Sequence, residues 1–108
     1  IDVRVNDLYS NMEIEQILAQ APCDVKARSL RLGSSSIPMS HALVQAGITA
    51  GRNTYGSPTL SDQAALTCDS LKLGPGDSLR SHTANEFIYV NEIEEAIPLY
   101  ISILKQAL

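Results

Sequence analysis

The sequence predicts an α/β fold, in which strands and helices alternate along the chain. Three patterns lead to this prediction. Apolar and polar residues alternate over residues 1–6, which is the period of a half-buried strand. Residues 10–21 and 91–108 instead repeat apolar residues every three or four positions, as amphipathic helices do. Residues 23–32 are again extended in pattern, so the opening third is predicted to be strand, helix, strand.

The first predicted helix has clear signals at both ends. Ser10 or Asn11 can cap it by accepting a hydrogen bond from a free backbone amide, and Pro22 cannot continue it. Its apolar residues recur at helical spacing and are Ile14, Ile17, Leu18 and Ala21. The second predicted strand has weak alternation and three cations, which favours a solvated face or a sheet edge.

The middle of the chain contains several groups of turn-forming residues. A polar break, Gly33 followed by three serines, marks a possible domain boundary. A helix of low charge is predicted over 39–48, a short helix from Ser61, and a small strand over 70–74.

The terminal segment has the clearest helical pattern. Asn91 and Glu94 resemble a capping pair, and nearby glutamates suit the positive end of a helix dipole. Pro98 is expected to kink the helix or delay its start. One face is predicted to pack on a large apolar surface and carries Ile93, Ala96, Ile97, Tyr100, Ile101, Leu104 and Leu108.

Composition excludes several classes of function. The chain has 108 residues, 44% of them hydrophobic, and a formal charge of −4 with scattered cations, so nucleic acid is not an expected partner. No apolar run approaches the roughly 20 residues that span a bilayer, so membrane insertion is not expected either. Cys23 and Cys68 lie far apart, which favours reduced thiols in a cytoplasmic protein.

Few residues point to chemistry by spacing alone. His82 follows a loop rich in glycine, where functional side chains are often presented, although a solvated bystander histidine is the commoner case. Arg4 fits either an ion pair at the surface or a fork for an anionic group. Ser61 and Asp62 can simply cap a helix, and the loop from Gly74 can be only a turn.

The order of these features is more specific than any single one. Residues 74–88 (GPGDSLRSHTANEFI), with 2–6 (DVRVN) and 55–62 (YGSPTLSD), resemble the carboxy-terminal end of the metallo-deacylases related to acetylornithine deacetylase and succinyl-diaminopimelate desuccinylase. The resemblance implies a zinc-exopeptidase-like catalytic domain and a ferredoxin-like lid that mediates homodimerisation. Residues 1–32 would be the last strand, helix and strand of the lid, and 33–108 the carboxy-terminal segment of the catalytic domain.

The same resemblance implies the reaction and the roles of residues. The enzymes hydrolyse the amide of an N-acyl amino acid with two divalent metal ions, usually zinc and in some cases cobalt. N-acetyl- or N-succinyl-ornithine of arginine biosynthesis is the nearest substrate class. His82 would be a metal ligand and Arg4 the group that binds the substrate carboxylate. The remaining substrate-binding positions would be Thr59, Ser61, Asp62, Gly74 and Ser78.

The chain lacks most of the catalytic set of that family. Its histidine and aspartate pair, bridging aspartate, further acidic ligand and general-base glutamate have no counterpart here. We therefore expect this polypeptide to be inactive alone, with no catalytic residue of its own, and the full-length parent to be the enzyme. The alternative is a non-catalytic dimerisation or ligand-binding module whose opening segment associates with itself.

Overall fold

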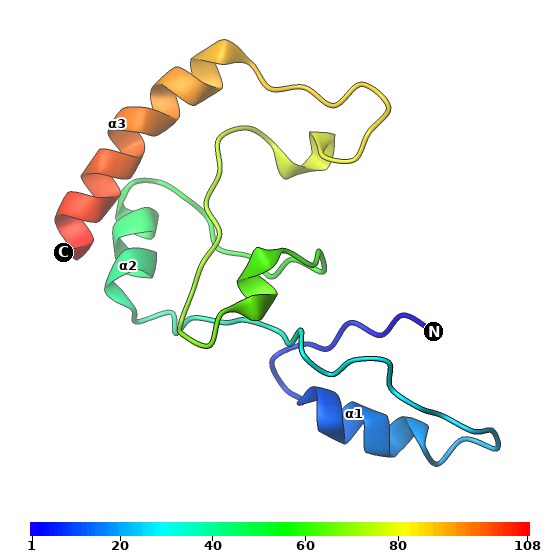
Figure 1. Ribbon diagram of the computed structural model, residues 1–108. Helices are drawn as coiled ribbons and strands as arrows, with labels where there is room; N and C mark the ends of the chain where they lie inside the picture. The colour runs from blue at the N-terminus through cyan, green and yellow to red at the C-terminus, as the bar shows by residue number, and fades with distance from the viewer. The chain divides into compact units, whose positions relative to one another are not determined.

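A computed structural model describes all 108 residues, and its regular structure is entirely helical (Figure 1). In chain order the elements are α1 (Asn11–Leu18), α2 (Ala42–Thr49), the 3₁₀ turn η1 (Asp62–Ala65), the 3₁₀ turn η2 (Ser78–Arg80) and α3 (Val90–Ala107). None of these helices combines the length and apolar character required to cross a membrane.

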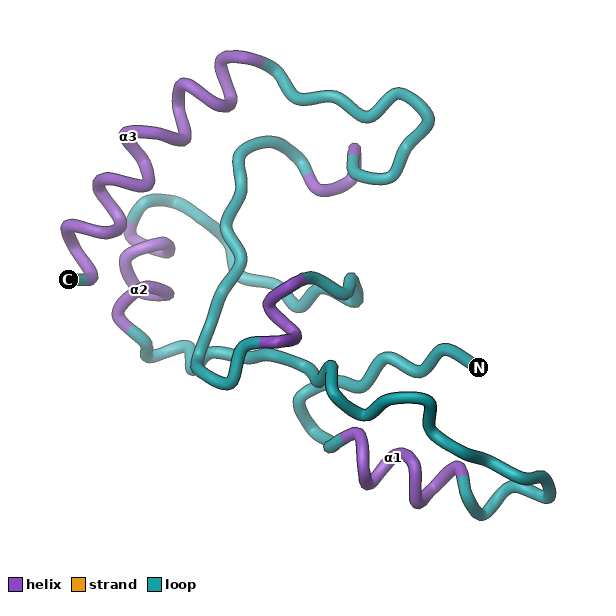
Figure 2. The backbone as a smooth tube through the Cα atoms, viewed as in Figure 1, coloured by secondary structure: helices purple, strands orange, loops and turns teal.

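The predicted α/β class is wrong, because no residue forms a β-strand (Figure 2). Residues 1–6, 23–32 and 70–74, all predicted as strands, run without a paired neighbour. A strand exists only where its backbone N–H and C=O groups pair in a ladder with another strand. The long-range bond from the Ser70 amide to the Ser36 carbonyl, 3.4 Å, does not extend into one. The lid and catalytic-domain topologies implied by the resemblance both need a sheet, and they are overturned with it.

The second predicted strand is instead held beside α1 by side chains. Asn11 donates from its amide nitrogen to the carbonyl oxygens of Leu30 and Leu32, both at 2.8 Å. The carboxylate of Glu15 accepts from the Ala27 amide at 3.3 Å. Because α1 meets these backbone groups with its own polar side chains, the segment is fixed locally without a sheet.

The predicted cap of α1 is confirmed at Ser10. The Ser10 hydroxyl accepts from the Glu13 amide at 3.2 Å, and the Glu13 carboxylate accepts from the Ser10 amide at 2.7 Å, which completes a capping box. The helix ends at Leu18, before the predicted boundary, and its last turns tighten into i to i−3 bonds ahead of Pro22.

The chain divides into two compact units. Unit 1 comprises Ile1–Pro38 and Gly56–Leu71, and unit 2 comprises Met39–Tyr55 and Lys72–Leu108. The four buried hydrophobic residues all belong to α2 and α3 in unit 2, and they are Val44, Ala46, Ala96 and Ile103. Unit 1 therefore has no buried core of its own.

In unit 2, α2 packs against α3, and a histidine begins the shorter helix (Figure 1). His41 Nδ1 accepts from the Leu43 amide at 3.2 Å and so caps α2. This hydrogen bond gives His41 a structural role and explains a histidine at a helix start.

The apolar residues of α3 divide between two faces, although a single packed face was predicted. Ala96 and Ile103 are buried, whereas an exposed stripe remains of Ile93, Ile97, Ile101, Leu104 and Leu108. The reason is that α2 packs against one side of α3. Ile97 and Ile101 lie between Ala96 and Ile103 along the helix but point to a different side, which α2 does not cover.

The start of α3 also differs from the prediction. Glu92, not the pair Asn91 and Glu94, meets the free amide at the helix start, where its Oε2 accepts from the Tyr89 amide at 2.9 Å. Pro98 lies inside the helix, which continues through it from Val90 to Ala107. Because α3 is capped at Tyr89, the residue three positions later is Glu92, and its carboxylate can fold back to the Tyr89 amide.

Candidate functional site

The residues predicted for the site fall in both units. Unit 1 holds Arg4, Thr59, Ser61 and Asp62, and unit 2 holds Gly74, Ser78 and His82. The side-chain hydrogen bonds of Arg4 and Ser78 and the amide hydrogen bond of His82 involve residues outside this predicted set.

Arg4 and Thr59 belong to neighbouring parts of unit 1. Arg4 Nη1 donates to the Pro58 carbonyl at 3.3 Å, and its Nε donates to Asp2 at 3.3 Å. The hydroxyls of Ser57 and Thr59 lie 2.7 Å apart. The structure therefore brings the guanidinium next to the residue that precedes Thr59, and both groups face solvent.

The other predicted substrate positions have structural surroundings. Ser61 is the residue before η1 but makes no capping hydrogen bond, and Asp62 is the first residue of that turn. Ser78 begins η2 and its hydroxyl accepts from the Tyr55 hydroxyl at 3.4 Å. A Cβ on Gly74 would meet no atom within 4 Å, so close packing does not require glycine there.

His82 has the most unusual backbone of these residues. It is the one non-glycine residue with positive φ, at 60°, in the left-handed region. That conformation costs an L-residue about 1–2 kcal/mol and is most often found where the surrounding structure imposes it. The imidazole makes no hydrogen bond within the chain, while the His82 amide donates to Glu86 Oε2 at 3.1 Å. The ring is thus exposed and available to a ligand.

Arg80, two residues earlier, joins the two ends of the loop that carries His82. Its Nη2 donates to Glu92 Oε1 at 2.5 Å, in the first turn of α3. Its guanidinium also lies over the rings of Phe87 and Tyr89, 4.9 and 5.2 Å from their centroids. These two rings meet edge to face with centroids 5.1 Å apart. Cation–π contacts and an ion pair therefore act on the same side chain.

A glycine completes this arrangement. Gly76 has φ of 81°, and a Cβ there would lie 3.3 Å from Ile88 side-chain atoms and 3.4 Å from Arg80 Nη2. Asp77 follows and its carboxylate accepts from the Leu79 amide at 2.9 Å, which caps η2. In the predicted Gly-Pro-Gly motif the second glycine, not Gly74, is the one that the packing requires.

The ion pair between Arg80 and Glu92 shifts the pKa values of both groups. The hydrogen bond from Arg80 holds the pKa of Glu92 below its usual value, and the Tyr89 amide acts in the same direction. The same hydrogen bond to Glu92 raises the pKa of Arg80. Both groups are therefore charged throughout the neutral range, and the loop remains tied to α3.

The lowered pKa of Glu92 predicts that the loop opens in acid. A carboxylate with a depressed folded-state pKa stabilises the structure above its ordinary pKa, near 4.5, and the contribution is lost as the pH falls through the lower folded value. We expect the Tyr89 amide, which donates to Glu92, to lose protection from hydrogen exchange over that interval. Glu92→Ala, which removes the acceptor of the Tyr89 amide, should show weak protection at every pH. A protection factor that stays constant in the parent chain as the pH is lowered from 6 until the Glu92 carboxylate is fully protonated would contradict this prediction.

The chain supplies a donor for a metal ion but not a full site. No three side chains among His, Cys, Asp and Glu lie close enough together to hold one. His82 fits a metal as a single ligand, because its imidazole is exposed and makes no hydrogen bond. A zinc site needs three or four protein ligands, so the remaining donors would have to come from other residues of the protein.

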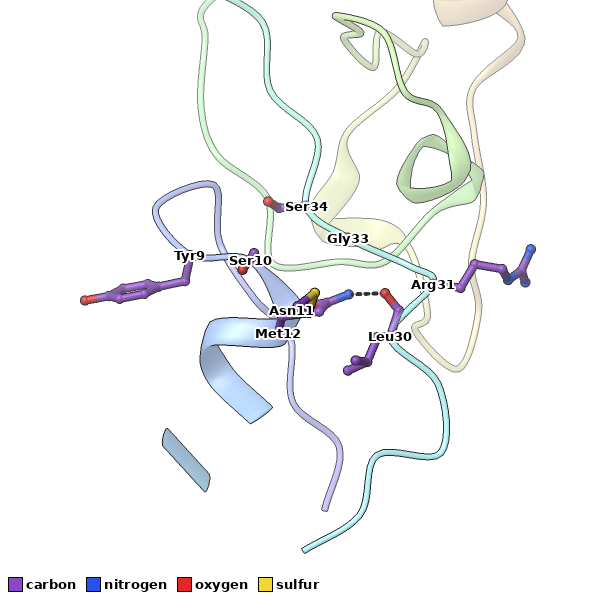
Figure 3. Close-up of a pocket in the computed structure, with 8 residues that line it drawn as sticks. All are labelled: Tyr9, Ser10, Asn11, Met12, Leu30, Arg31, Gly33 and Ser34. Carbon is purple, nitrogen blue, oxygen red and sulfur yellow. Dashed lines mark hydrogen bonds between the residues drawn. The ribbon is translucent and has the colours of Figure 1, made fainter. Parts of the chain in front are cut away.

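The described pocket lies elsewhere, in unit 1 (Figure 3). It is an open hollow of about 340 Å³ beside the start of α1, and no predicted site residue lines it. Tyr9 and Arg31 point away from its centre in Figure 3, and the Asn11 amide is already bonded to backbone carbonyls. The pocket is open and contains none of the residues for which a role was predicted, so the His82 loop is the stronger candidate.

Two residues of the candidate site were assigned no role from the sequence, Arg80 and Glu86. Both lie inside the recognised motif, two residues before and four residues after His82. The available signal for Arg80 was that two aromatic residues, at 87 and 89, and the carboxylate of Glu92 follow it, since both groups can bind a guanidinium. Their roles depend on a chain reversal between η2 and α3, which no local pattern specifies.

Similarity to known proteins gives no assignment for this chain. No protein-family model matches it, and no curated protein matches its sequence. The functional interpretation therefore depends on the motifs and on the geometry of the His82 loop.

Proposed function

We propose that this chain is the carboxy-terminal portion of a metal-dependent amidohydrolase that cleaves an N-acyl amino acid, with N-acetyl- or N-succinyl-ornithine as the substrate class. His82 is one metal ligand, and Arg4 binds the substrate carboxylate. The observation that carries the proposal is the conformation of the His82 loop. The His82 imidazole makes no hydrogen bond, and the His82 backbone has a strained positive φ that the contact with Glu86 maintains.

The chemistry assigned to each residue matches its environment. A metal pair supplies a bound hydroxide near neutral pH and polarises the scissile carbonyl. His82 presents a ring nitrogen, and its loop is tied to α3 through Arg80 and Glu92. Arg4 is exposed and retains guanidinium N–H groups beyond its bonds to Asp2 and the Pro58 carbonyl. A planar fork of this kind can bind a carboxylate through two hydrogen bonds.

The distribution of apolar residues supports a larger catalytic assembly. Unit 1 has no buried residue, and exposed side chains in it include Leu8, Tyr9 and Met12, at 77%, 51% and 63% exposure. Large apolar side chains gain free energy when they are covered. Further polypeptide that packs on them would also carry the missing metal ligands and the general base. The free thiols Cys23 and Cys68 are compatible with the proposed cytoplasmic location.

The proposal is tested by activity of the intact protein. Purified protein loaded with Zn²⁺ or Co²⁺ is expected to release ornithine from N-acetyl- or N-succinyl-ornithine, and chelation is expected to stop the release. The 108-residue chain alone is expected to be inactive. Ornithine release that persists in a chelator, or an intact protein with no amidase activity on either substrate with either metal, overturns the proposal.

Replacing Arg4 should weaken capture of the substrate while metal binding is retained. In Arg4→Ala we expect KM to rise about tenfold or more, because a charge-assisted hydrogen bond contributes roughly 1.5–3 kcal/mol. Metal content should equal that of the parent protein. Arg28→Ala, which removes a charge from the same unit, is the matched control and should leave KM unchanged. An unaltered KM in Arg4→Ala would assign the carboxylate to another residue.

A second candidate is a non-catalytic module that associates with itself through residues 1–32. The exposed apolar side chains of α1 and the turn before it favour this reading. The two proposals differ in a simple measurement, because the module predicts a stable homodimer of the 108-residue chain by light scattering with no uptake of Zn²⁺. A monomer would remove this candidate.

A further inference from the structure

The left-handed backbone of His82 needs a cause, and the adjoining contacts supply one. The His82 amide is bonded to the carboxylate of Glu86, and the Thr83 hydroxyl donates to the Arg80 carbonyl at 2.7 Å. These bonds close the segment 80–86 on itself. The backbone at His82 is thus set by side chains that flank it on both sides.

Arg80 connects this small closed segment to α3. Its side chain is only 17% exposed, and it touches Glu92, Phe87 and Tyr89. The same Glu92 carboxylate that binds Arg80 also caps α3 through the Tyr89 amide. One guanidinium therefore ties η2, the stretch after His82 and the start of the longest helix together.

We propose that Arg80 is a positioning residue for His82. By holding both ends of the loop against the start of α3, it fixes where the imidazole is presented, and Glu86 then fixes the local backbone. The proposal rests on the proposed function, in which His82 binds a metal ion. In this role Arg80 acts through its contacts with Glu92, Phe87 and Tyr89 and not by binding the metal or the substrate.

The test is the Zn²⁺ affinity of the intact protein carrying Arg80→Ala. Loss of a residue that orients a metal ligand typically weakens affinity about 10–100-fold, and we expect a loss in that range. Turnover should recover at saturating Zn²⁺, because His82 is still present. Arg52→Ala is the matched control, since it removes an exposed arginine from the same unit and should bind Zn²⁺ as the parent does.

A second readout does not depend on metal. Hydrogen exchange at the His82 amide should be at least tenfold faster in Arg80→Ala than in Arg52→Ala, because the loop that presents this amide to Glu86 is released. Glu86→Ala should also accelerate the exchange, whereas Glu86→Gln retains a carbonyl acceptor and should largely restore protection. Arg80→Lys should be intermediate, since an ammonium keeps the charge but lacks the planar fork.

The outcomes separate this inference from the proposed function. If His82→Ala loses Zn²⁺ but Arg80→Ala binds it as tightly as Arg52→Ala, the positioning role is wrong and the metal role stands. If His82→Ala binds Zn²⁺ normally, the metal role is wrong, and exchange at the His82 amide decides the positioning role. Unchanged exchange in Arg80→Ala would overturn that role as well.

Discussion

His82→Ala in the intact protein is expected to lower turnover at least about 100-fold and to reduce the bound metal. The reason is that the substitution removes a ligand, which should exceed the roughly 10–100-fold cost of losing a group that only orients one. The environment supports this expectation, because the imidazole is exposed, makes no hydrogen bond and stands on a backbone at φ 60°. Metal content by mass spectrometry and ornithine release measure the two effects.

The chain contains a matched control for this experiment. His41 is the other histidine, and its ring caps α2 by accepting from the Leu43 amide. Asparagine is a favourable cap, so His41→Asn removes an imidazole and retains the helix start. It should keep metal content and turnover. If both variants behave like the parent protein, no histidine of this chain binds a functional metal.

Ile103→Ala is expected to destabilise unit 2 by about 2–5 kcal/mol, the range for truncating a buried isoleucine to alanine. Ile103 is 5% exposed and belongs to a core that has only three other buried residues. A loss of this size is a large fraction of the 5–15 kcal/mol that typically holds a domain folded. Urea denaturation followed by helical circular dichroism gives the change directly.

The same helix provides the comparison. Ile101 is 50% exposed, two residues away, so Ile101→Ala changes the same side chain on the exposed face of α3. In the 108-residue chain its effect should stay within about 0.5 kcal/mol. Equal losses for the two variants would mean that α3 does not bury the face described here.

Sequence patterns predicted correctly those features of the structure that depend on residues close together in the chain. Ser10 was among the predicted caps of the first helix and is the cap observed, because a serine three residues before a glutamate can satisfy two backbone amides without distant partners. The position of the terminal helix also followed from its repeat of apolar residues, although its first residue did not. The placement of His82 on a loop was predicted from the glycines that precede it.

Interactions between segments that are distant in the sequence could not be predicted from such patterns. Alternation over residues 1–6 describes what a strand would bury, but a strand forms only with a partner, and none is paired here. The face of α3 that is buried depends on where α2 packs, since apolar residues recur at helical spacing on more than one side of α3. The grouping of Arg80 with Phe87, Tyr89 and Glu92 likewise depends on how the chain reverses.

The sequence by itself therefore determined the Ser10 cap of α1, the positions of the main helical segments and the loop that carries His82, because hydrogen bonds and contacts within a few residues decide these features. Only the tertiary structure decided that no sheet forms, that α3 buries Ala96 and Ile103, and that Arg80 meets Glu92 at the start of α3. Each of these depends on atoms that the folded chain, and not the order of its residues, brings within contact distance.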